Sequence, residues 1–517
     1  MTSAPAADPL GSLDFAFAAL PPAAADGPEP TPDSQDYFAL AVRIDPDALL
    51  LVGKPTTTGG GSTDTSTRPK GPKDSGSGTT TDPTPPPPTN TGGTDTTPPP
   101  PTNTGGTDTT PPPPSTLPPY HLMVSRAADF IGSLGVNTHM GNAAYGDAAS
   151  VLDQLNFIGV HRIRDWFPES VWPLQYAQLG TLTSSGVKLD ALLPNINPVD
   201  LTGHLSALTA FVRAHPGTVT SIEGPNEIDA SPIVYRGLNG IAAVQALQQD
   251  LFAAVKGTAE LSSIPVYNFT TGWRPQSDYG IGDMSPYADY ANVHGYVPNG
   301  MRPADWLPGT INSFTSNMPG KSIILTETNY YTLPLDSNWG GVNENVQAKY
   351  GLYTALDDWN AGIAATFFYE LRDEAADQQR EHNFGLFHAD GTPKTFAIAL
   401  HNLAAILGDT GPAANSFQLN PVTVSFSGLP STAAAHLLQK SDGSSDLVVW
   451  NEQQIWDPVN HVQLVATTAD VTVVLDRSFS TVEVYDPLVS ASPLATYHGV
   501  SQFTVHLADG PLVFHLI

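Results

Sequence analysis

The feature that most constrains the fold is a regular series of short apolar or β-branched segments between residues 130 and 370. Their ends lie near His139, Arg164, Pro194, Glu227, Thr270, Tyr296, Glu327 and Glu370. The first end and the last are 231 residues apart, which gives a mean interval of 33 residues. The stretches between them, such as 148–154 and 241–252, carry apolar residues at helical spacing. Strands that alternate with helices at about 31 residues per unit are typical of a (β/α)8 barrel.

We therefore predict an α/β fold with a (β/α)8 barrel, also called a TIM barrel. An open, doubly wound sheet is the alternative, since it also alternates strands with helices. The glycine-rich phosphate-binding turn expected of that fold is missing from these segments.

The sequence before the barrel has a different composition. Residues 56–118 are rich in Pro, Thr and Gly, and a 13-residue unit begins at Pro85 and again at Pro98. The unit has no apolar face to stack, so a solenoid is excluded and a disordered, semi-extended linker is predicted. At about 3.1 Å per residue, this linker reaches at most roughly 195 Å. Residues 1–55 contain too few apolar side chains for a core of their own, and their role is not predicted.

The sequence after the barrel predicts an all-β domain. A helix is expected over 395–407, and the segments that follow alternate apolar and polar residues without any helical stretch. They are 422–426, 447–450, 471–475, 481–485 and 512–516. We predict a β-sandwich here. The expected organisation is therefore an N-terminal segment 1–55, a linker 56–118, a catalytic barrel 119–408 and a β-sandwich 409–517.

Composition excludes several classes of function. The formal net charge is −29, with 50 acidic and 21 basic side chains, so the basic surface of a nucleic-acid-binding protein is missing. The chain has no cysteine, which excludes disulfides, thiolate metal sites and cysteine nucleophiles. No run of 18 apolar residues is present, so we expect no membrane span. The histidines do not follow a metal-binding spacing, so neither a metal site nor a cofactor is predicted.

Two of the predicted strands end in glutamates. Glu227 follows the fourth strand and Glu327 follows the seventh, 100 residues later. Active sites of such barrels lie at the carboxyl ends of the strands. Two carboxyl groups that face each other there are suited to glycoside hydrolysis: one protonates the leaving oxygen, and the other attacks the anomeric carbon or activates water. Glu223 is an alternative for the acid, although no Asn precedes it.

The sequences around these glutamates resemble those of clan A glycoside hydrolases, a (β/α)8 superfamily that includes family 5 cellulases and family 39 glycosidases. Asn226-Glu227 is similar to the Asn-Glu pair of the clan's fourth strand, and Glu327 in Ile-Leu-Thr-Glu-Thr is similar to its strand-seven nucleophile. The resemblance implies that Glu227 is the acid/base, that Asn226 contacts the sugar 2-hydroxyl and that Glu327 is the nucleophile. It covers residues 120–407.

Two further motifs belong to the same resemblance. Arg164 follows Gly159 by five residues, like the strand-two Arg that fixes and ionises the nucleophile in the clan. His294-Gly-Tyr296 is similar to the His-x-Tyr of family 5, whose Tyr hydrogen-bonds the nucleophile. The chain departs from the clan at strand eight, where Phe-Phe-Tyr369 stands in place of the usual Trp. It also has Gly-Pro-Asn-Glu-Ile where the best-known members have Asn-Glu-Pro. The identity of the sugar is therefore not predicted.

Other polar and aromatic residues near the strand ends have two interpretations each. His139 could bind sugar hydroxyls or make a simple strand-end hydrogen bond. Trp273 could stack on a sugar face or pack into the rim of the barrel. Tyr369 stands at the position of the sugar platform, and Glu370 could pair with Arg372.

The predicted function is hydrolysis of a β-linked glycoside or polysaccharide with retention of configuration, through a glycosyl intermediate on Glu327. A non-catalytic carbohydrate-binding protein and a transglycosidase that uses the same glutamates are the alternatives. We expect a carbohydrate as the partner and a monomer in solution. The linker favours an extracellular or cell-surface location. Residues 1–20 lack the basic residue of a classical signal peptide, so export would use another signal.

Overall fold

The computed structural model describes residue 120 and residues 122–168, 172–336, 340–420 and 422–517. The predicted N-terminal segment and linker lie outside these residues, and the domain boundaries stay predictions. All the described residues belong to one compact unit, Ser115–Ile517. None of the helices within the described ranges combines the length and the apolar composition needed to cross a bilayer.

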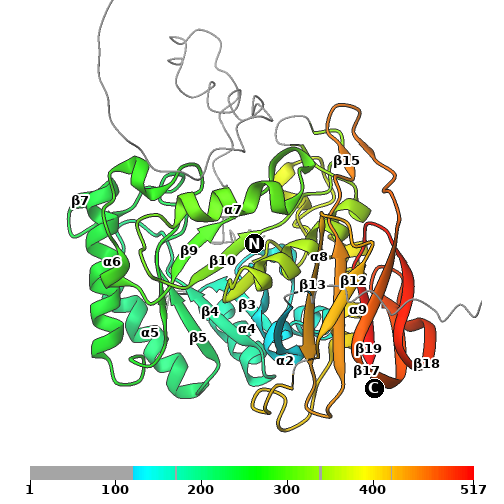
Figure 1. Ribbon diagram of the computed structural model, residues 1–517. Helices are drawn as coiled ribbons and strands as arrows, with labels where there is room; N and C mark the ends of the chain where they lie inside the picture. The colour runs from blue at the N-terminus through cyan, green and yellow to red at the C-terminus, as the bar shows by residue number, and fades with distance from the viewer. Residues whose placement is uncertain (1–119, 121, 169–171, 337–339, 421) are drawn as a thin grey trace, which may run out of the picture. The chain divides into compact units, whose positions relative to one another are not determined.

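Eight parallel strands form a nearly closed barrel (Figure 1). In chain order they are β2 (Leu134–Asn137), β3 (Arg162–Trp166), β4 (Lys188–Leu192), β5 (Val219–Glu223), β8 (Val266–Tyr267), β9 (Ala291–His294), β10 (Ile323–Thr328) and β11 (Ala365–Phe368). Their spatial order is β8-β5-β4-β3-β2-β11-β10-β9. A parallel bridge between Tyr267 and Tyr290 brings β8 next to the start of β9 and so joins the two ends of this order. Each predicted apolar segment overlaps one of these strands, which confirms the predicted barrel.

An α-helix follows each of these strands except β8. The helices are α3 (Ala148–Ile158), α4 (Pro173–Ser184), α5 (Leu201–Ala214), α6 (Gly240–Gly257), α7 (Pro303–Phe314), α8 (Glu344–Asn360) and α9 (Thr395–Leu407), and α2 (Ala127–Ser133) precedes β2. Residues 268–290, which the structure describes in full, instead contain the 3₁₀ turns η4 (Gln276–Tyr279) and η5 (Ser285–Tyr287). Single 3₁₀ turns η3 (Ala143–Tyr145), η6 (Pro298–Gly300) and η7 (Arg380–Asn383) and a short hairpin, β6 (Val234–Tyr235) and β7 (Leu238–Asn239), lie in other loops.

The start of β3 is fixed by the end of α3. The Asp147 side chain accepts a hydrogen bond from the Ser150 backbone and so caps the first turn of α3. Gly159 ends the helix with φ at 70°, a conformation that costs other residues energy. A Cβ at Gly159 would also lie 2.6 Å from that of Ala404 in α9. This close approach of α3 and α9 sets the position from which β3 carries Arg164 into the barrel.

The C-terminal strands form a seven-stranded sheet that folds over on an apolar core of its own. Its members are β1 (Met123–Arg126), β12 (Val424–Ser427), β13 (Ala433–Gln439), β14 (Ser445–Asn451), β17 (Ala469–Asp486), β18 (Ser490–Leu507) and β19 (Leu512–Leu516). The first half of β17 pairs with β12 and its second half with β19, with a register shift between Val474 and Phe479. The predicted sandwich is thereby confirmed. The segments 471–475 and 481–485 belong to one bent strand, because exposed polar residues at 476–478 interrupt its apolar alternation.

The sandwich also contains a strand from the beginning of the barrel region. β1 pairs in parallel with β13, so the chain enters the sheet before it enters the barrel. The sequence did not predict this pairing, because a four-residue strand has too short a pattern to reveal its partner.

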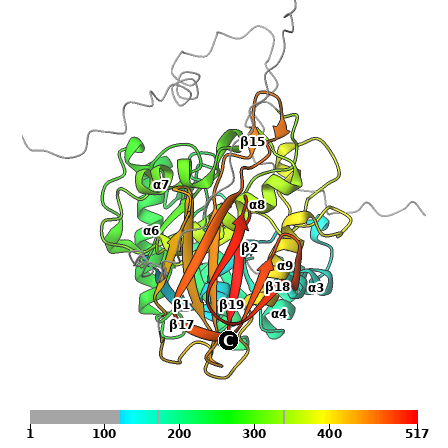
Figure 2. The same ribbon diagram turned by 45° about the vertical axis from the view of Figure 1, so that its right-hand side comes forward.

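The sandwich packs on helix α8 of the barrel (Figure 2). Trp450 of β14 is fully buried, and its Nε1 donates a hydrogen bond to Asp357 at 2.8 Å. Lys349 forms an ion pair with Asp509 at 2.5 Å. A short hairpin, β15 (Trp456–Asp457) and β16 (Val462–Gln463), extends from the sandwich, and Gln454 just before it donates a hydrogen bond to the Gly300 carbonyl at 2.9 Å. Leu438, Val448, Trp450 and Val513 of the sandwich therefore belong to the same apolar core as the barrel, in addition to the separate core inside the folded sheet.

Candidate active site

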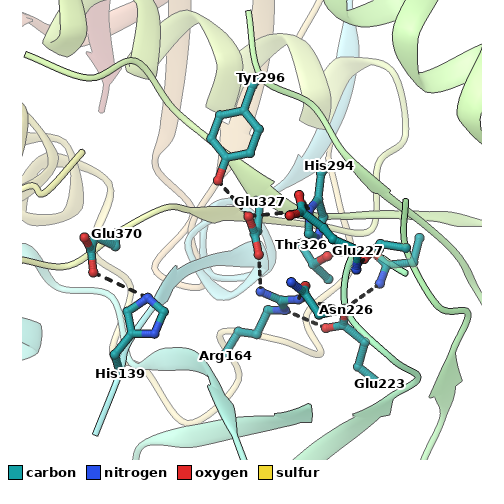
Figure 3. A network of polar contacts seen from close by, with 12 residues as sticks. His139, Arg164, Glu223, Asn226, Glu227, His294, Tyr296, Thr326, Glu327 and Glu370 are labelled. Carbon is teal, nitrogen blue, oxygen red and sulfur yellow. Dashed lines mark hydrogen bonds and ion pairs between the residues drawn. The ribbon is translucent and has the colours of Figure 1, made fainter. Parts of the chain in front are cut away.

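The two predicted catalytic glutamates lie at the carboxyl ends of their strands (Figure 3). Glu327 is the next-to-last residue of β10, and Glu227 lies four residues beyond β5. Glu227 has a positive φ of 38°, so the chain turns sharply at this residue. Its backbone N–H donates a hydrogen bond to the Thr270 hydroxyl at 3.0 Å. The loop after β8 therefore holds the turn that carries Glu227.

Both oxygens of Glu327 accept hydrogen bonds. Arg164 donates from Nη1 to Oε1 at 2.6 Å, and the Tyr296 hydroxyl donates to Oε2 at 2.7 Å. Arg164 lies within β3, Tyr296 two residues beyond β9 and Glu327 near the end of β10, and they meet as the motifs predicted. Glu327 is thus held in one orientation by a cation and a neutral donor.

His294 lies between the two glutamates (Figure 3). Its Nδ1 is 2.8 Å from Glu227 Oε1 and 3.4 Å from Glu327 Oε2. One carboxyl oxygen of Glu227 lies within 4.8 Å of one of Glu327. The two carboxyl groups therefore face each other across a short gap.

The surroundings of the two glutamates shift their pKa values in opposite directions. Burial raises the pKa of Glu227 above its ordinary value, and the hydrogen bond from His294 only partly offsets this effect. Burial also acts to raise the pKa of Glu327, but His294, Arg164 and the hydrogen bond from Tyr296 outweigh it, so this pKa is lowered. Such a difference suits one proton donor and one ionised nucleophile.

Asn226 is fixed beside Glu227. Its side-chain oxygen accepts a hydrogen bond from Arg164 Nη2 at 2.6 Å, and its carbonyl accepts one from the Asn195 side chain at 2.5 Å. The Asn-Glu pair predicted from the sequence therefore adjoins the arginine that contacts Glu327.

Glu223, the alternative for the acid, has a different environment. Its side chain is fully buried and accepts two hydrogen bonds from Arg164. It accepts a third from Asn292 Nδ2 at 2.9 Å, and Thr326 donates to Asn292 Oδ1 at 2.7 Å. The Glu223 side chain is thus 0% exposed and paired with a cation, whereas that of Glu227 is 13% exposed; this difference favours Glu227 as the acid.

The candidates after the first and eighth barrel strands, β2 and β11, lie on the side of Glu327 opposite Glu227 (Figure 3). The ring of Tyr369 contacts that of His139 edge-on, with 5.5 Å between centroids, and lies 6.3 Å from the ring of Tyr296. Glu370 contacts His139, and the suggested pairing of Glu370 with Arg372 is wrong (Figure 3). Arg372 instead donates to the side chain of Gln154 at 2.9 Å, because its guanidinium extends toward α3.

Trp273 lies on the loop after β8, next to Glu227. The residue is 55% exposed, and its backbone N–H donates to Asp229 at 2.9 Å. The preceding Gly272 packs closely against the Glu227 carboxyl group, since a Cβ at this position would lie 2.9 Å from Glu227 Cδ. The exposure excludes the core-packing interpretation of Trp273 and leaves the sugar-stacking interpretation open.

Sequence reasoning missed Thr270, Gly272 and Asn292. Asn292 and Thr326 are polar residues within otherwise apolar strands, a signal that could have marked them as members of a buried network. Thr270 and Gly272 follow a strand of two residues and carry no comparable pattern.

The fold resembles those of three solved glycoside hydrolases. A monomeric β-xylosidase from Caulobacter crescentus CB15 has a TM-score of 0.52 and 15% identity, over 75% of this chain and 96% of that one. A family 39 glycoside hydrolase from Bacteroides cellulosilyticus WH2 has a TM-score of 0.51 and 16% identity, over 75% and 82% of the two chains. A family 39 enzyme from Xanthomonas axonopodis pv. citri has a TM-score of 0.50 and 14% identity, over 76% and 95%.

At these identities the likeness establishes the fold alone. It confirms, at that level, the resemblance to clan A glycoside hydrolases that the motifs indicated. No protein-family model and no curated protein sequence matches the chain.

Proposed function

We propose that the protein hydrolyses a β-linked glycoside with retention of configuration, with Glu327 as nucleophile and Glu227 as acid/base. The observation that carries this proposal is the separation of the two carboxyl groups, whose nearest oxygens lie within 4.8 Å of each other. Retaining glycosidases place their carboxyl groups about 5–5.5 Å apart, whereas inverting ones need about 6.5–9.5 Å to admit a water between them.

In the first step, Glu327 Oε attacks the anomeric carbon while Glu227 transfers its proton to the leaving oxygen. The C–O bond of the glycoside breaks, and its electron pair stays on the departing oxygen. Arg164 and Tyr296 hold Glu327 ionised and oriented for the attack. Burial raises the pKa of Glu227, which favours the protonated form that a proton donor needs.

In the second step, Glu227 is a carboxylate and takes a proton from water. The water oxygen attacks the anomeric carbon from the face that the leaving group vacated, and Glu327 departs as a carboxylate. Two inversions restore the original configuration. If a second sugar hydroxyl replaced water, the same residues would perform transglycosylation.

The exposed Trp273 lies on the Glu227 side of the site, where the leaving group departs. We assign it to contact with that part of the substrate, because aromatic faces pack well on sugar rings. We also propose that the protein acts outside the cell or at its surface, since the Pro- and Thr-rich linker would separate the barrel from an attachment point.

The test is a screen of aryl β-glycosides and plant and fungal polysaccharides with the wild type, Glu327→Gln and Glu260→Gln side by side. Glu260 is a surface residue paired with Arg213 and serves as the matched control. The proposal predicts turnover by the wild type and the control, a loss of several orders of magnitude in Glu327→Gln, and a β-configured first product by NMR. A first product of α configuration would exclude retention, and turnover by none of the three would favour the non-catalytic alternative.

A further inference from the structure

A second group of ionisable side chains lies beside the candidate active site. His139 follows β2, and Glu370 and Glu374 follow β11. One ligand atom from each of the three lies within 4.8 Å of the other two. Neither the proposed hydrolysis nor the motifs of the sequence use Glu374.

Glu370 is the unusual member, because it is fully buried and no Lys or Arg of the described residues forms an ion pair with it. One of its oxygens, Oε2, accepts a hydrogen bond from the Tyr145 hydroxyl at 2.5 Å. The other, Oε1, has no hydrogen-bond partner among the described residues. The two nearby cationic side chains have other partners: Lys394 pairs with Asp373 at 2.7 Å, and Arg372 binds Gln154. A buried carboxyl group with an unsatisfied oxygen is costly unless a ligand or a cation completes it.

His139 has the chemistry of a metal ligand. Its buried Nε2 also has no hydrogen-bond partner within the described part of the chain. Imidazole nitrogens are common ligands of transition-metal ions. Nε2 lies 3.5 Å from Glu370 Oε2 (Figure 3). This distance is long for a hydrogen bond, whereas two ligands about 2.1 Å from one tetrahedral ion are about 3.4 Å apart.

Glu374 supplies the third ligand from a more accessible position. Its side chain is 23% exposed, and His382 Nε2 lies 3.7 Å from its Oε2. It therefore faces solvent on one side and the buried pair on the other, which gives an ion a path of entry.

We propose that His139, Glu370 and Glu374 bind a divalent transition-metal ion of the Zn²⁺ class. One imidazole and two carboxylates are a donor set that such ions accept, whereas Mg²⁺ and Ca²⁺ prefer sites made of oxygen alone. The Tyr145 hydroxyl would orient Glu370 from behind, as outer hydrogen bonds do in metal sites. Three protein ligands leave a position open for an outside oxygen.

The position of the proposed metal site relative to Glu327 indicates which part of a substrate the ion would contact. Tyr369 lies between His139 and Tyr296, so the ion would sit on the side of Glu327 away from Trp273 and the leaving group. There the open position would take a hydroxyl of the sugar that becomes attached to Glu327. This role rests on the proposed function, whereas binding of the ion does not.

The test is calorimetric titration of Zn²⁺ into the full-length protein after treatment with a chelator. We expect one ion per chain in the wild type and a loss of affinity of at least about tenfold in Glu374→Gln. His139→Gln is the second variant and should show the same loss. Glu327→Gln is the matched control, because Glu227, His294 and Glu327 form the other group of possible ligands; it should bind like the wild type.

Binding of Co²⁺, measured by its absorption spectrum, is a second test of the same site. The visible absorption of bound Co²⁺ should appear in the wild type and in Glu327→Gln and be absent from Glu374→Gln. The proposal is overturned if Zn²⁺ shows no saturable binding up to about 1 mM, if both Glu374→Gln and His139→Gln bind as tightly as the wild type, or if the loss follows Glu327→Gln instead. Because binding is measured without a substrate, failure of the glycoside screen would leave this result unaffected.

Discussion

Glu223 accepts two hydrogen bonds from Arg164, at 2.6 Å from Nε and 2.9 Å from Nη2. This bidentate pair fixes the plane of the guanidinium and directs Nη1 to Glu327. A buried carboxylate on β5 thereby positions the side chain of Glu327 on β10, through Arg164. We therefore regard Glu223 as a positioning residue.

Replacing Glu223 by Gln should destabilise the fold. The change leaves the buried Arg164 without its bidentate partner, and breaking a buried ion pair in this way costs about 3–5 kcal/mol. Urea unfolding should show a clear fall in the free energy of unfolding. Glu260→Gln breaks the exposed pair with Arg213 and should leave the midpoint unchanged. Equal midpoints for the two variants would contradict a stabilising buried pair between Glu223 and Arg164.

The pH dependence of kcat/KM should be bell-shaped. Glu327 must be ionised, so activity falls as the pH drops through its lowered pKa. Glu227 must be protonated, so activity falls as the pH rises through its raised pKa. Tyr296→Phe removes a hydrogen bond to ionised Glu327, which raises the pKa of Glu327 and moves the acidic limb to higher pH. The basic limb should stay in place. A shift confined to the basic limb would show that Tyr296 acts on the pKa of Glu227 and would contradict this prediction.

Gly272→Ala should reduce activity while the protein stays folded. The added Cβ would lie 2.9 Å from Glu227 Cδ and Oε1, so the end of this side chain must move away. A displacement of about 1 Å at a catalytic group can cost about 100-fold in rate. Gly282→Ala is the matched control, because its Cβ would meet no atom within 4 Å. Unchanged kcat/KM in Gly272→Ala would show that Glu227 is not the proton donor.

A fragment that ends at residue 408 should not fold as a stable unit. Without the sandwich, α8 loses the partners of Asp357 and Lys349, and the surface that the buried Trp450 covers becomes exposed to water. β1 also loses its pairing with β13. We expect poor solubility and no cooperative thermal transition for 119–408, and normal behaviour for 119–517. A sharp transition in the shorter fragment would contradict the shared core.

The sequence predicted the barrel well, because each of its strands is a continuous apolar segment that ends in polar residues. That pattern brought Arg164, Glu227, His294, Tyr296 and Glu327 together, since strand ends of a barrel meet at one face. It predicted a helix after β8 that the structure replaces with 3₁₀ turns. Gly272, Pro275, Gly280 and Pro286 fall in that stretch and explain why no helix forms.

The remaining contacts depend on loops that bring distant residues together. Glu370 and Glu374 meet His139 more than 200 residues away in the sequence, through segments with no regular period. The hydrogen bond from the Glu227 backbone N–H to the Thr270 hydroxyl likewise joins two loops, whose paths are set by the packing of β5 and β8. Patterns of hydrophobicity report on strands and helices, and they carry no information on such contacts.

The most direct test of the proposed division of work is the stereochemistry of azide rescue. With an activated aryl β-glycoside, Glu327→Ala should regain turnover in azide and give an α-glycosyl azide, because azide enters the space left by the nucleophile. Glu227→Ala should form the glycosyl-enzyme without a proton donor and then yield a β-glycosyl azide. NMR of the two products measures this directly. The proposed roles predict opposite configurations in that order; exchanged configurations would contradict them and reverse the roles of Glu227 and Glu327.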